Sequence, residues 1–469
     1  MRTQRGCRVY LFTLLLAAAA QPSVRAQDQC LACHEAMEDK SALLFKRDVH
    51  FLKGLSCASC HGGDKSREEM DESMNKEAGF LGVPSGDEVS SVCAACHSDE
   101  AVIVKTYRSS LPVDQMASLT ASVHGKSSIK GDQRIAQCTT CHGAHGILSK
   151  NNRSSPVHPL NVPATCAKCH SNPQYLRSYN PALPVDQLDK YRTSVHGKKN
   201  AAGDANVAEC ASCHGSHDIL PAKDVRSRVY ATNLPGTCGS CHSDATLMRK
   251  YRIPADQLVK YSRSVHGIAL LQKKDLGAPA CNDCHGNHGA VPPGVESISK
   301  VCGTCHALNA ELFSASPHKK AFDQRKLPEC ETCHSHHDVV AATDELLGVG
   351  KEAVCAWCHS PEKSPGGYEV ARTMRTFVDS LLAEENKATQ LVAEAEQKGM
   401  EVGEAKFKLR EVRQARLESR TKVHSFDESQ FREVAERGLT SAAAVSEEAA
   451  EAFVYIRRLE KEQSSRGPF

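Results

Sequence analysis

Most cysteines in this 469-residue sequence belong to one short pattern, Cys-x-x-Cys-His, in which two thiols and an imidazole stand together. Twenty-two of the twenty-three cysteines fall in this pattern, and only Cys7 lies outside it. The eleven copies are Cys30, Cys33 and His34; Cys57, Cys60 and His61; Cys93, Cys96 and His97; Cys138, Cys141 and His142; Cys166, Cys169 and His170; Cys210, Cys213 and His214; Cys238, Cys241 and His242; Cys281, Cys284 and His285; Cys302, Cys305 and His306; Cys330, Cys333 and His334; and Cys355, Cys358 and His359. Two cysteines at this spacing form thioethers with the two vinyl groups of one haem, and the histidine binds the iron. We therefore predict eleven covalently bound haems c.

Two other uses of paired cysteines were weighed against haem. Zinc sites combine two such pairs, or one pair with separately spaced histidines, and do not need a histidine directly after every second cysteine. A disulfide framework is typical of exported chains. It would not repeat one spacing eleven times, as this sequence does. The pattern therefore favours covalent haem over zinc and over disulfides.

The composition points the same way. Aromatic residues make up only 5% of the sequence, and Trp357 is the single tryptophan. Because aromatic side chains supply much of the buried area of an ordinary core, we expect eleven porphyrins to fill the core here. The 58 basic and 56 acidic side chains nearly cancel, which argues against a nucleic-acid partner. The haem propionates would make the complete protein acidic.

Twelve histidines remain after the eleven of the motifs, and they are candidates for the second axial ligand of each iron. They are His50, His124, His145, His158, His196, His217, His266, His288, His318, His336, His337 and His424. If only one of the adjacent His336 and His337 binds iron, eleven candidates serve eleven haems, which favours His/His coordination throughout. His158 has an alternative role as a packing residue, because Tyr230 takes its place in the next repeat.

After the first motif the chain repeats a unit that contains two motifs. Three units are plain: LPVDQMASLTASVHG with CTTCHGAH and CAKCH, LPVDQLDKYRTSVHG with CASCHGSH and CGSCH, and IPADQLVKYSRSVHG with CNDCHGNH and CGTCH. Two looser copies flank them. We place the repeats at about residues 41–99, 107–172, 179–244, 251–308 and 309–361. The haem region, residues 27–361, is thus five two-haem repeats after a single first motif.

Each of the three plain units contains two histidines that recur at fixed places. In the second plain unit, Pro184 suits the first turn of a helix and Gly197 the position just past its end. We expect His196, and likewise His124 and His266, to project from the last turn of such a helix.

The second recurring histidine is the last residue of CHGxH: His145, His217 and His288. It follows the motif histidine by three residues, on the side where that ligand already lies, so we expect it to serve a neighbouring haem. Asp64 takes this position in the first repeat. Met37 takes it after His34 and is either a packing residue or a ligand that gives a His/Met haem.

The two ends of the chain differ from the repeats. The first 26 residues predict a secretory signal peptide, with arginines before twelve apolar residues (9–20) and a small-residue cleavage site at 24–26. Residues 362–469 contain no cysteine and one histidine, His424, and their apolar residues recur at helical spacing. We predict two or three long helices in a haem-free bundle, the last of them preceded by a capping box from Ser425 to Glu428. His424 either folds back as a distal ligand or is solvated, and the charged helix faces offer a surface for homo-oligomers.

The sequence resembles the multihaem c-type cytochromes with doubled CXXCH motifs. The resemblance covers residues 27–360 and rests on CTTCHGAH, CASCHGSH and CNDCHGNH, each followed by a second CXXCH. It implies a mainly α and irregular fold with very little β structure, bis-histidine haems, and an exported respiratory electron carrier. The redox partners it implies are a quinol-oxidising membrane complex or other cytochromes. The periplasm is the first expectation for location, with outer-membrane or extracellular association as alternatives.

Two other functions stay open at this point. The C-terminal helices look similar to those of multihaem nitrite reductases and hydroxylamine oxidoreductases, which implies an enzyme acting on a small nitrogen or sulfur species at one five-coordinate haem. Against this, all eleven motifs end in histidine, and the CXXCK haem site of nitrite reductases is absent. The third reading is a subunit of an extracellular haem filament. We expect an electron carrier rather than an enzyme, with no residue assigned as catalytic.

Overall fold

The structure is a computed structural model that describes residues 28–127, 133–293 and 298–465. The signal peptide expected at residues 1–26 lies outside the described residues. The chain forms two compact units, one of residues 1–168 with 177–180 and the other of residues 169–176 with 181–469. We describe each unit by itself.

Up to residue 361 the described chain consists of short helices joined by irregular loops, and none of its α-helices exceeds eleven residues. No strand forms among the described residues, where an isolated bridge joins Ser127 to Arg134. The mainly α and irregular fold is confirmed. The elements up to residue 170 are α1 (Gln29–Ala36), α2 (Lys40–Phe45), α3 (Val49–Leu52), α4 (Ala58–His61), α5 (Met70–Ser73), α6 (Asp87–His97), the π-turn η1 (Ala101–Thr106), α7 (Gln115–Ala121), α8 (Cys138–His142) and α9 (Val162–His170).

The later repeats continue in the same style. Their elements are α10 (Pro173–Tyr179), α11 (Gln187–Thr193), α12 (Val195–Ala201), α13 (Cys210–His214), α14 (Leu234–His242), α15 (Ala245–Tyr251), α16 (Gln257–Arg263), α17 (Val265–Gly267), the π-turn η2 (Ile268–Gln272), α18 (Cys281–His285), α19 (Ile298–Gly303), α20 (Ala307–Ala315), α21 (Pro317–Arg325), α22 (Glu329–His334) and the 3-10 turns η4 (Asp344–Leu346) and η5 (Val354–Trp357).

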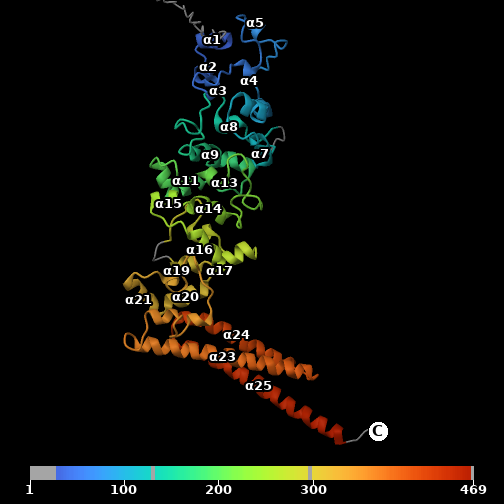
Figure 1. Ribbon diagram of the computed structural model, residues 1–469, viewed down its shortest axis with the longest axis vertical. Coiled ribbons are helices and arrows are strands. Elements are labelled where there is room, and N and C mark those ends of the chain that lie inside the picture. The colour runs from blue at the N-terminus through green and yellow to red at the C-terminus, as the bar shows by residue number, and fades with distance from the viewer. Residues whose placement is uncertain (1–27, 128–132, 294–297, 466–469) are drawn as a thin grey trace, which may run out of the picture. The chain divides into compact units, whose positions relative to one another are not determined.

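Three long helices follow and pack against one another: α23 (Pro365–Gln397), α24 (Gly403–Lys422) and α25 (Glu428–Ser465) (Figure 1). Their apolar stripes form two clusters of buried side chains. One cluster is centred on Leu381 and Phe431, and the other on Ala388 and Val445. The bundle therefore has a side-chain core of its own.

The start of α25 differs from the predicted capping box. The Asp427 carboxylate accepts hydrogen bonds from the amides of Ser429 and Gln430, at 2.9 and 3.2 Å. Ser425 instead donates its hydroxyl to the carbonyl of Lys422. Asp427 is therefore the N-cap of this helix, since its side chain reaches the first free amides, which the sequence pattern assigned to Ser425.

Buried apolar side chains are distributed unevenly along the described chain. Twelve lie between residues 28 and 361, whereas seventeen lie in the shorter stretch from residue 362 onward. Helices as short as those of the repeats are marginal without packing partners, so the repeats depend on something other than a side-chain core. No helix of the described residues is both long and apolar enough to cross a membrane.

The bundle also reaches back to the repeats within the second unit. The turn between α24 and α25, η6 (Val423–Ser425), contacts α20, and so does α24. The boundary expected at residue 361 thus lies inside the second unit. This contact carries His424 into the region of the motifs.

Candidate haem sites

Eight of the eleven cysteine pairs lie on or at the start of short helices that end at the motif histidine. The first motif of each repeat occupies such a helix almost alone: α4, α8, α13, α18 and α22. The second motifs of the first three repeats form the last turn of a longer helix: α6, α9 and α14. All twenty-two motif cysteines are described, and no disulfide joins them.

Histidine rings from the motifs face other histidine rings in eight pairs. Each pair joins one motif histidine to one of the twelve remaining histidines, with ring centres 5.8–6.3 Å apart. The pairs are His97 with His50, His61 with His145, His242 with His196, His214 with His288, His306 with His266, His285 with His337, His359 with His318, and His334 with His424.

This separation fits a pair of axial ligands. Metal–imidazole bonds are about 2.0 Å long, so two rings bound to opposite faces of one iron have centres about 6 Å apart. Aromatic rings that merely pack together range more widely, from about 4.5 to 7 Å. The eight pairs fall within half an ångström of one another. The residues present therefore fit haem iron with two histidine ligands.

Hydrogen bonds hold several of these rings in the orientation that iron needs. The Nδ1 atoms of His61, His285 and His424 lie 2.9, 3.2 and 3.0 Å from the carbonyl oxygens of Gly82, Val291 and Thr421. A ring that donates its Nδ1 proton to such an acceptor keeps the lone pair of Nε2 for a metal. Burial lowers the pKa of His318 and of His337 to about 4, which keeps both rings neutral.

His50 has a carboxylate as its partner. The Asp48 Oδ1 atom is 2.8 Å from Nδ1 of His50, and its Oδ2 atom accepts the amide of Ile147 at 2.7 Å. Burial opposes ionisation of Asp48, but the hydrogen bonds from His50 and Ile147 outweigh it and lower the pKa of this carboxyl group. Asp48 was not predicted from the sequence, although an aspartate two residues before a histidine is a visible signal.

The pattern predicted that the recurring Ser-Val-His-Gly sequence is the end of a helix, and this prediction is wrong. The helix begins at Gln187, breaks at Ser194, and a new helix starts at Val195, so His196 lies in a first turn. The Ser194 hydroxyl donates to the carbonyl of Tyr191 and accepts the amide of Gly197. A Cβ atom on Gly197 would lie 1.9 Å from the Tyr191 oxygen. Glycine is needed here for this close approach rather than as a helix C-cap.

Successive repeats are joined through these histidine segments. The Val49 amide, next to His50, donates to the carbonyl of Ile147, which follows His145 by two residues. Val195 donates to Ala290 and Val265 to Val339 in the same way. One repeat therefore supplies both a backbone bond and a histidine ring to the repeat before it.

Cysteines of successive motifs are also neighbours within each unit. The Cys93 thiol is adjacent to that of Cys138, Cys238 to Cys281, and Cys302 to Cys330. Burial raises the pKa values of five other thiols. Nearby charges, including that of a cysteine in the neighbouring motif, raise them further. These thiols, each with its neighbour, are Cys57 beside Cys30, Cys60 beside Cys96, Cys213 beside Cys238, Cys284 beside Cys302, and Cys333 beside Cys355. Among these cysteines the attachment points follow one another in sequence order.

Some candidate residues are outside the eight pairs. His124, His142, His170 and His217 have contacts of their own, and their pairing stays a prediction. His158 is buried, and its Nδ1 accepts the amide of Leu160. His336 is exposed beside His337. His34 has Asp39 as its partner, at 2.9 Å.

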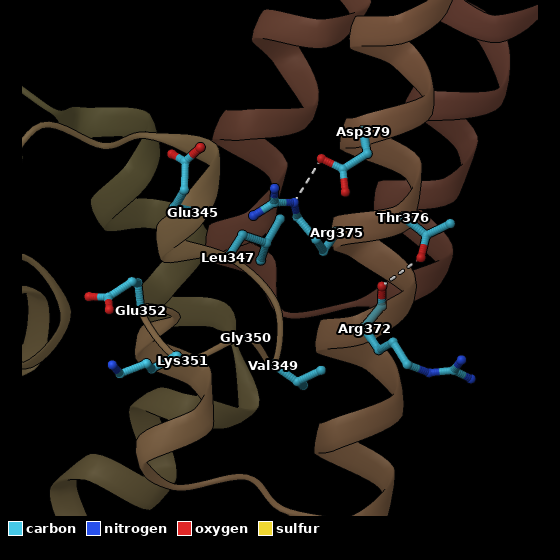
Figure 2. Close-up of a pocket in the computed structure, with 10 residues that line it drawn as sticks. All are labelled: Glu345, Leu347, Val349, Gly350, Lys351, Glu352, Arg372, Arg375, Thr376 and Asp379. Carbon is cyan, nitrogen blue, oxygen red and sulfur yellow. Dashed lines mark hydrogen bonds and ion pairs between the residues drawn. The ribbon is translucent and has the colours of Figure 1, made fainter.

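A cleft at the start of the bundle contains neither cysteine nor histidine. It lies between the loop at residues 345–352 and helix α23, with Arg375 paired to Asp379 at 2.8 Å (Figure 2). Arg375 also donates to the carbonyl of Asp344. The charged side chains of the cleft hold the loop that leads to the Cys355 motif in place. The cleft has no metal ligand of the kind found in the eight histidine pairs.

Comparisons with known proteins agree with the geometry. The model of the family described as cytochrome c3 matches residues 49–171, and the model of cytochrome c554 and c-prime matches residues 15–62. The multiheme cytochrome MtrA of Shewanella baltica is 26% identical over 47% of this chain. The C-type polyheme cytochrome OmcC of Geobacter sulfurreducens is 21% identical over 55% of it, and the nine-heme cytochrome c of Desulfovibrio desulfuricans is 23% identical over 47%.

These relatives differ in how much of their own length is covered. The matched region spans 54% of MtrA and 36% of OmcC, so this chain covers about half of the one and a third of the other. It covers 71% of the nine-heme cytochrome c. The similarity therefore leaves the complete activities of those proteins aside.

Proposed function

Since the chain is a multihaem c-type cytochrome that transfers electrons, we propose that it carries eleven covalently bound haems and passes electrons along them in an exported respiratory pathway. The eight histidine pairs carry this proposal, because each has the spacing of two ligands on one iron. Haem c, when bound, supplies the one-electron Fe(III)/Fe(II) couple.

The protein's part is to hold and space the irons. The cysteine pairs fix each attachment point, and the paired histidines fill the axial positions within each unit. His61 and His145 come from different repeats, as do His214 and His288, so each pair ties one repeat to the next. The contacts between cysteines of successive motifs favour a chain of redox centres in sequence order.

The partners of such a chain are other redox proteins. Two named relatives are described as multiheme and polyheme cytochromes. We propose that a quinol-oxidising membrane complex or another cytochrome delivers electrons, and that the location is the periplasm. The other three motifs, at His34, His142 and His170, are proposed as haem sites on the strength of their sequence.

The intact mass of the purified protein, compared with that of its polypeptide, tests the count. We expect eleven haems per chain, and a smaller number at full occupancy would contradict the proposal. Electron paramagnetic resonance of the oxidised protein then reports the ligands, because irons with two histidines are low-spin.

A variant tests the pairing within the second unit. His424→Ala removes the ring opposite His334 and is expected to convert one low-spin haem to high-spin. His336→Ala is the matched control, since this exposed ring lies outside the eight pairs and its loss should leave the spectrum unchanged. If His424→Ala leaves all haems as they were, His424 is not a ligand.

A further inference from the structure

His34 differs from the other motif histidines in its surroundings. Its Nδ1 lies 2.9 Å from the Asp39 carboxylate, which also caps helix α2 through the amide of Ser41 at 2.8 Å. The ring is therefore held as an iron ligand would be. Every histidine of the sequence is among the described residues. None of them lies opposite His34 at ligand spacing in the part of the chain that the structure describes.

Among the histidines outside the eight pairs, His158 is unsuited to this haem. In the first unit, His158 is 7% exposed, and its Nδ1 accepts the amide of Leu160 at 3.2 Å. A neutral ring used in this way carries its proton on Nε2, so Nε2 has no lone pair for iron. The same backbone turn holds Tyr230 in the next repeat, bonded through Ser227 as His158 is through Ser155. His158 is a packing residue of that turn.

Met37 is the other nearby donor. It follows His34 by three residues and ends helix α1, with its amide bonded to the carbonyl of Cys33. The side chain is 61% exposed. A residue placed here lies on the side of the motif that His34 already occupies, so its sulfur cannot reach the opposite face of the same haem.

We propose that the haem on Cys30 and Cys33 has His34 as its one protein ligand, and that its other axial position binds small ligands of haem iron. Carbon monoxide on the ferrous iron and cyanide on the ferric iron represent this class. The site is at the first motif, where Cys33 is exposed and Cys30 neighbours Cys57 of the next motif. This inference rests on the proposed function, because it needs a haem at this motif and a path for electrons to it.

The arrangement gives this iron a strong donor on one side. A carboxylate that accepts the Nδ1 proton makes a histidine a more basic ligand. Asp39 serves His34 in this way, as Asp48 serves His50. His50 is opposite another histidine, however, whereas the first site combines the carboxylate with a face that a small molecule can take.

Titration of the dithionite-reduced holoprotein with carbon monoxide tests the site. We expect one carbon monoxide bound per chain, and one high-spin haem in the electron paramagnetic resonance spectrum of the oxidised protein. The double variant Cys30→Ala, Cys33→Ala should lose both signals together with one haem in the mass. His158→Ala and His336→Ala are controls that should keep the wild-type stoichiometry.

A second variant covers the case in which the double variant does not mature. In the resonance Raman spectrum of the ferrous protein, an iron–histidine stretching band arises from a haem with a single histidine ligand. Asp39→Asn weakens the donation to His34 and should lower the frequency of this band. Asp189→Asn, an exposed carboxylate paired with Arg192, should leave it in place.

Three results would overturn the inference while leaving electron transfer through the haems intact. Eleven haems in the mass with none high-spin and no carbon monoxide bound would show a second protein ligand at the first site. Carbon monoxide binding that survives in the double variant would place the open iron elsewhere. Binding that appears only on dilution would mean that a second copy of the chain supplies the ligand. A mass of ten haems without the Cys30 haem would instead count against the proposed function itself.

Discussion

At the scale of single residues, the structure explains how an imidazole becomes a ligand for iron. A ring must present Nε2 without its proton, and a hydrogen-bond acceptor at Nδ1 secures this tautomer. Backbone carbonyls serve His61, His285 and His424, whereas carboxylates serve His34 and His50. His158 shows the opposite case, since its Nδ1 is itself the acceptor.

The carboxylate at His50 should set the potential of its haem. Asp48→Asn keeps the shape of the side chain but removes the negative charge next to the His50 ring, which makes His50 a weaker donor and favours ferrous iron. We expect one midpoint potential to rise by up to about 60 mV, the equivalent of a tenfold change in a one-electron equilibrium. A spectroelectrochemical titration measures it.

The control for this change is Asp189→Asn, which removes a charge from an exposed side chain far along the chain from His50. Its titration should overlay that of the unchanged protein. Equal shifts in the two variants would show that net charge, rather than the Asp48–His50 contact, sets the potential.

At the scale of elements, the break between α11 and α12 places His196 opposite His242. The same break recurs between α16 and α17, where Ser264 accepts the amide of Gly267. Sequence periodicity predicted one continuous helix here, because the serine and glycine of the turn also fit a helix end. The difference arises from a side-chain hydrogen bond that periodicity does not contain.

Gly197→Ala tests this element. The new Cβ would lie 1.9 Å from the carbonyl oxygen of Tyr191, so the turn must move and the His196 ring with it. We expect one additional high-spin haem and a loss of about 1–3 kcal/mol in the free energy of unfolding, as in other overpacked sites. Gly366→Ala is the matched control, since its Cβ meets nothing within 4 Å. A normal low-spin spectrum for Gly197→Ala would show that the turn adapts.

The C-terminal bundle is the element with a conventional core. Leu381 is fully buried, whereas its neighbour Leu382 is 38% exposed. Leu381→Ala should lower the free energy of unfolding of the bundle by about 2–5 kcal/mol, and Leu382→Ala by about 0.5 kcal/mol or less. Far-ultraviolet circular dichroism in denaturant measures both. Because η6 lies between two of these helices, Leu381→Ala should also release His424 at a lower denaturant concentration. A high-spin haem should then appear at that lower concentration. Similar losses for the two leucines would contradict the assigned core.

At the scale of the whole molecule, the two parts of the chain are stabilised by different means. The described residues up to 361 contain few buried apolar side chains, and their helices are too short to persist alone. Backbone bonds such as Val49 to Ile147 and Val195 to Ala290 join consecutive repeats within each unit, but they are few. Covalent haem is the remaining source of packing surface for this region.

Production of the chain without haem attachment tests this division. We expect limited proteolysis to digest the region up to residue 361 and to leave a resistant helical fragment of about residues 365–465, whose seventeen buried apolar side chains form its own core. The haem-loaded protein is the control and should resist cleavage throughout. Mass spectrometry of the fragments identifies the boundary. Equal resistance of the haem-free and haem-loaded chains would show that the repeats fold by themselves.

The sequence by itself determined the cofactor class and the mainly α and irregular fold, and it predicted the two-motif repeat and a set of histidines as candidate ligands. These depend on local spacing: a Cys-x-x-Cys-His segment contains both attachment points and the first ligand, and a stripe of apolar residues contains the face of a helix. The tertiary structure decided which ring faces which, as with His145 opposite His61 and His424 opposite His334. It also decided that His158 accepts a hydrogen bond at Nδ1 and that His34 has Asp39 as its partner. It placed Asp48 next to His50 and Ile147. The physical reason is that each histidine pair joins segments far apart in the chain, and their meeting depends on how the repeats bond to one another rather than on any local pattern.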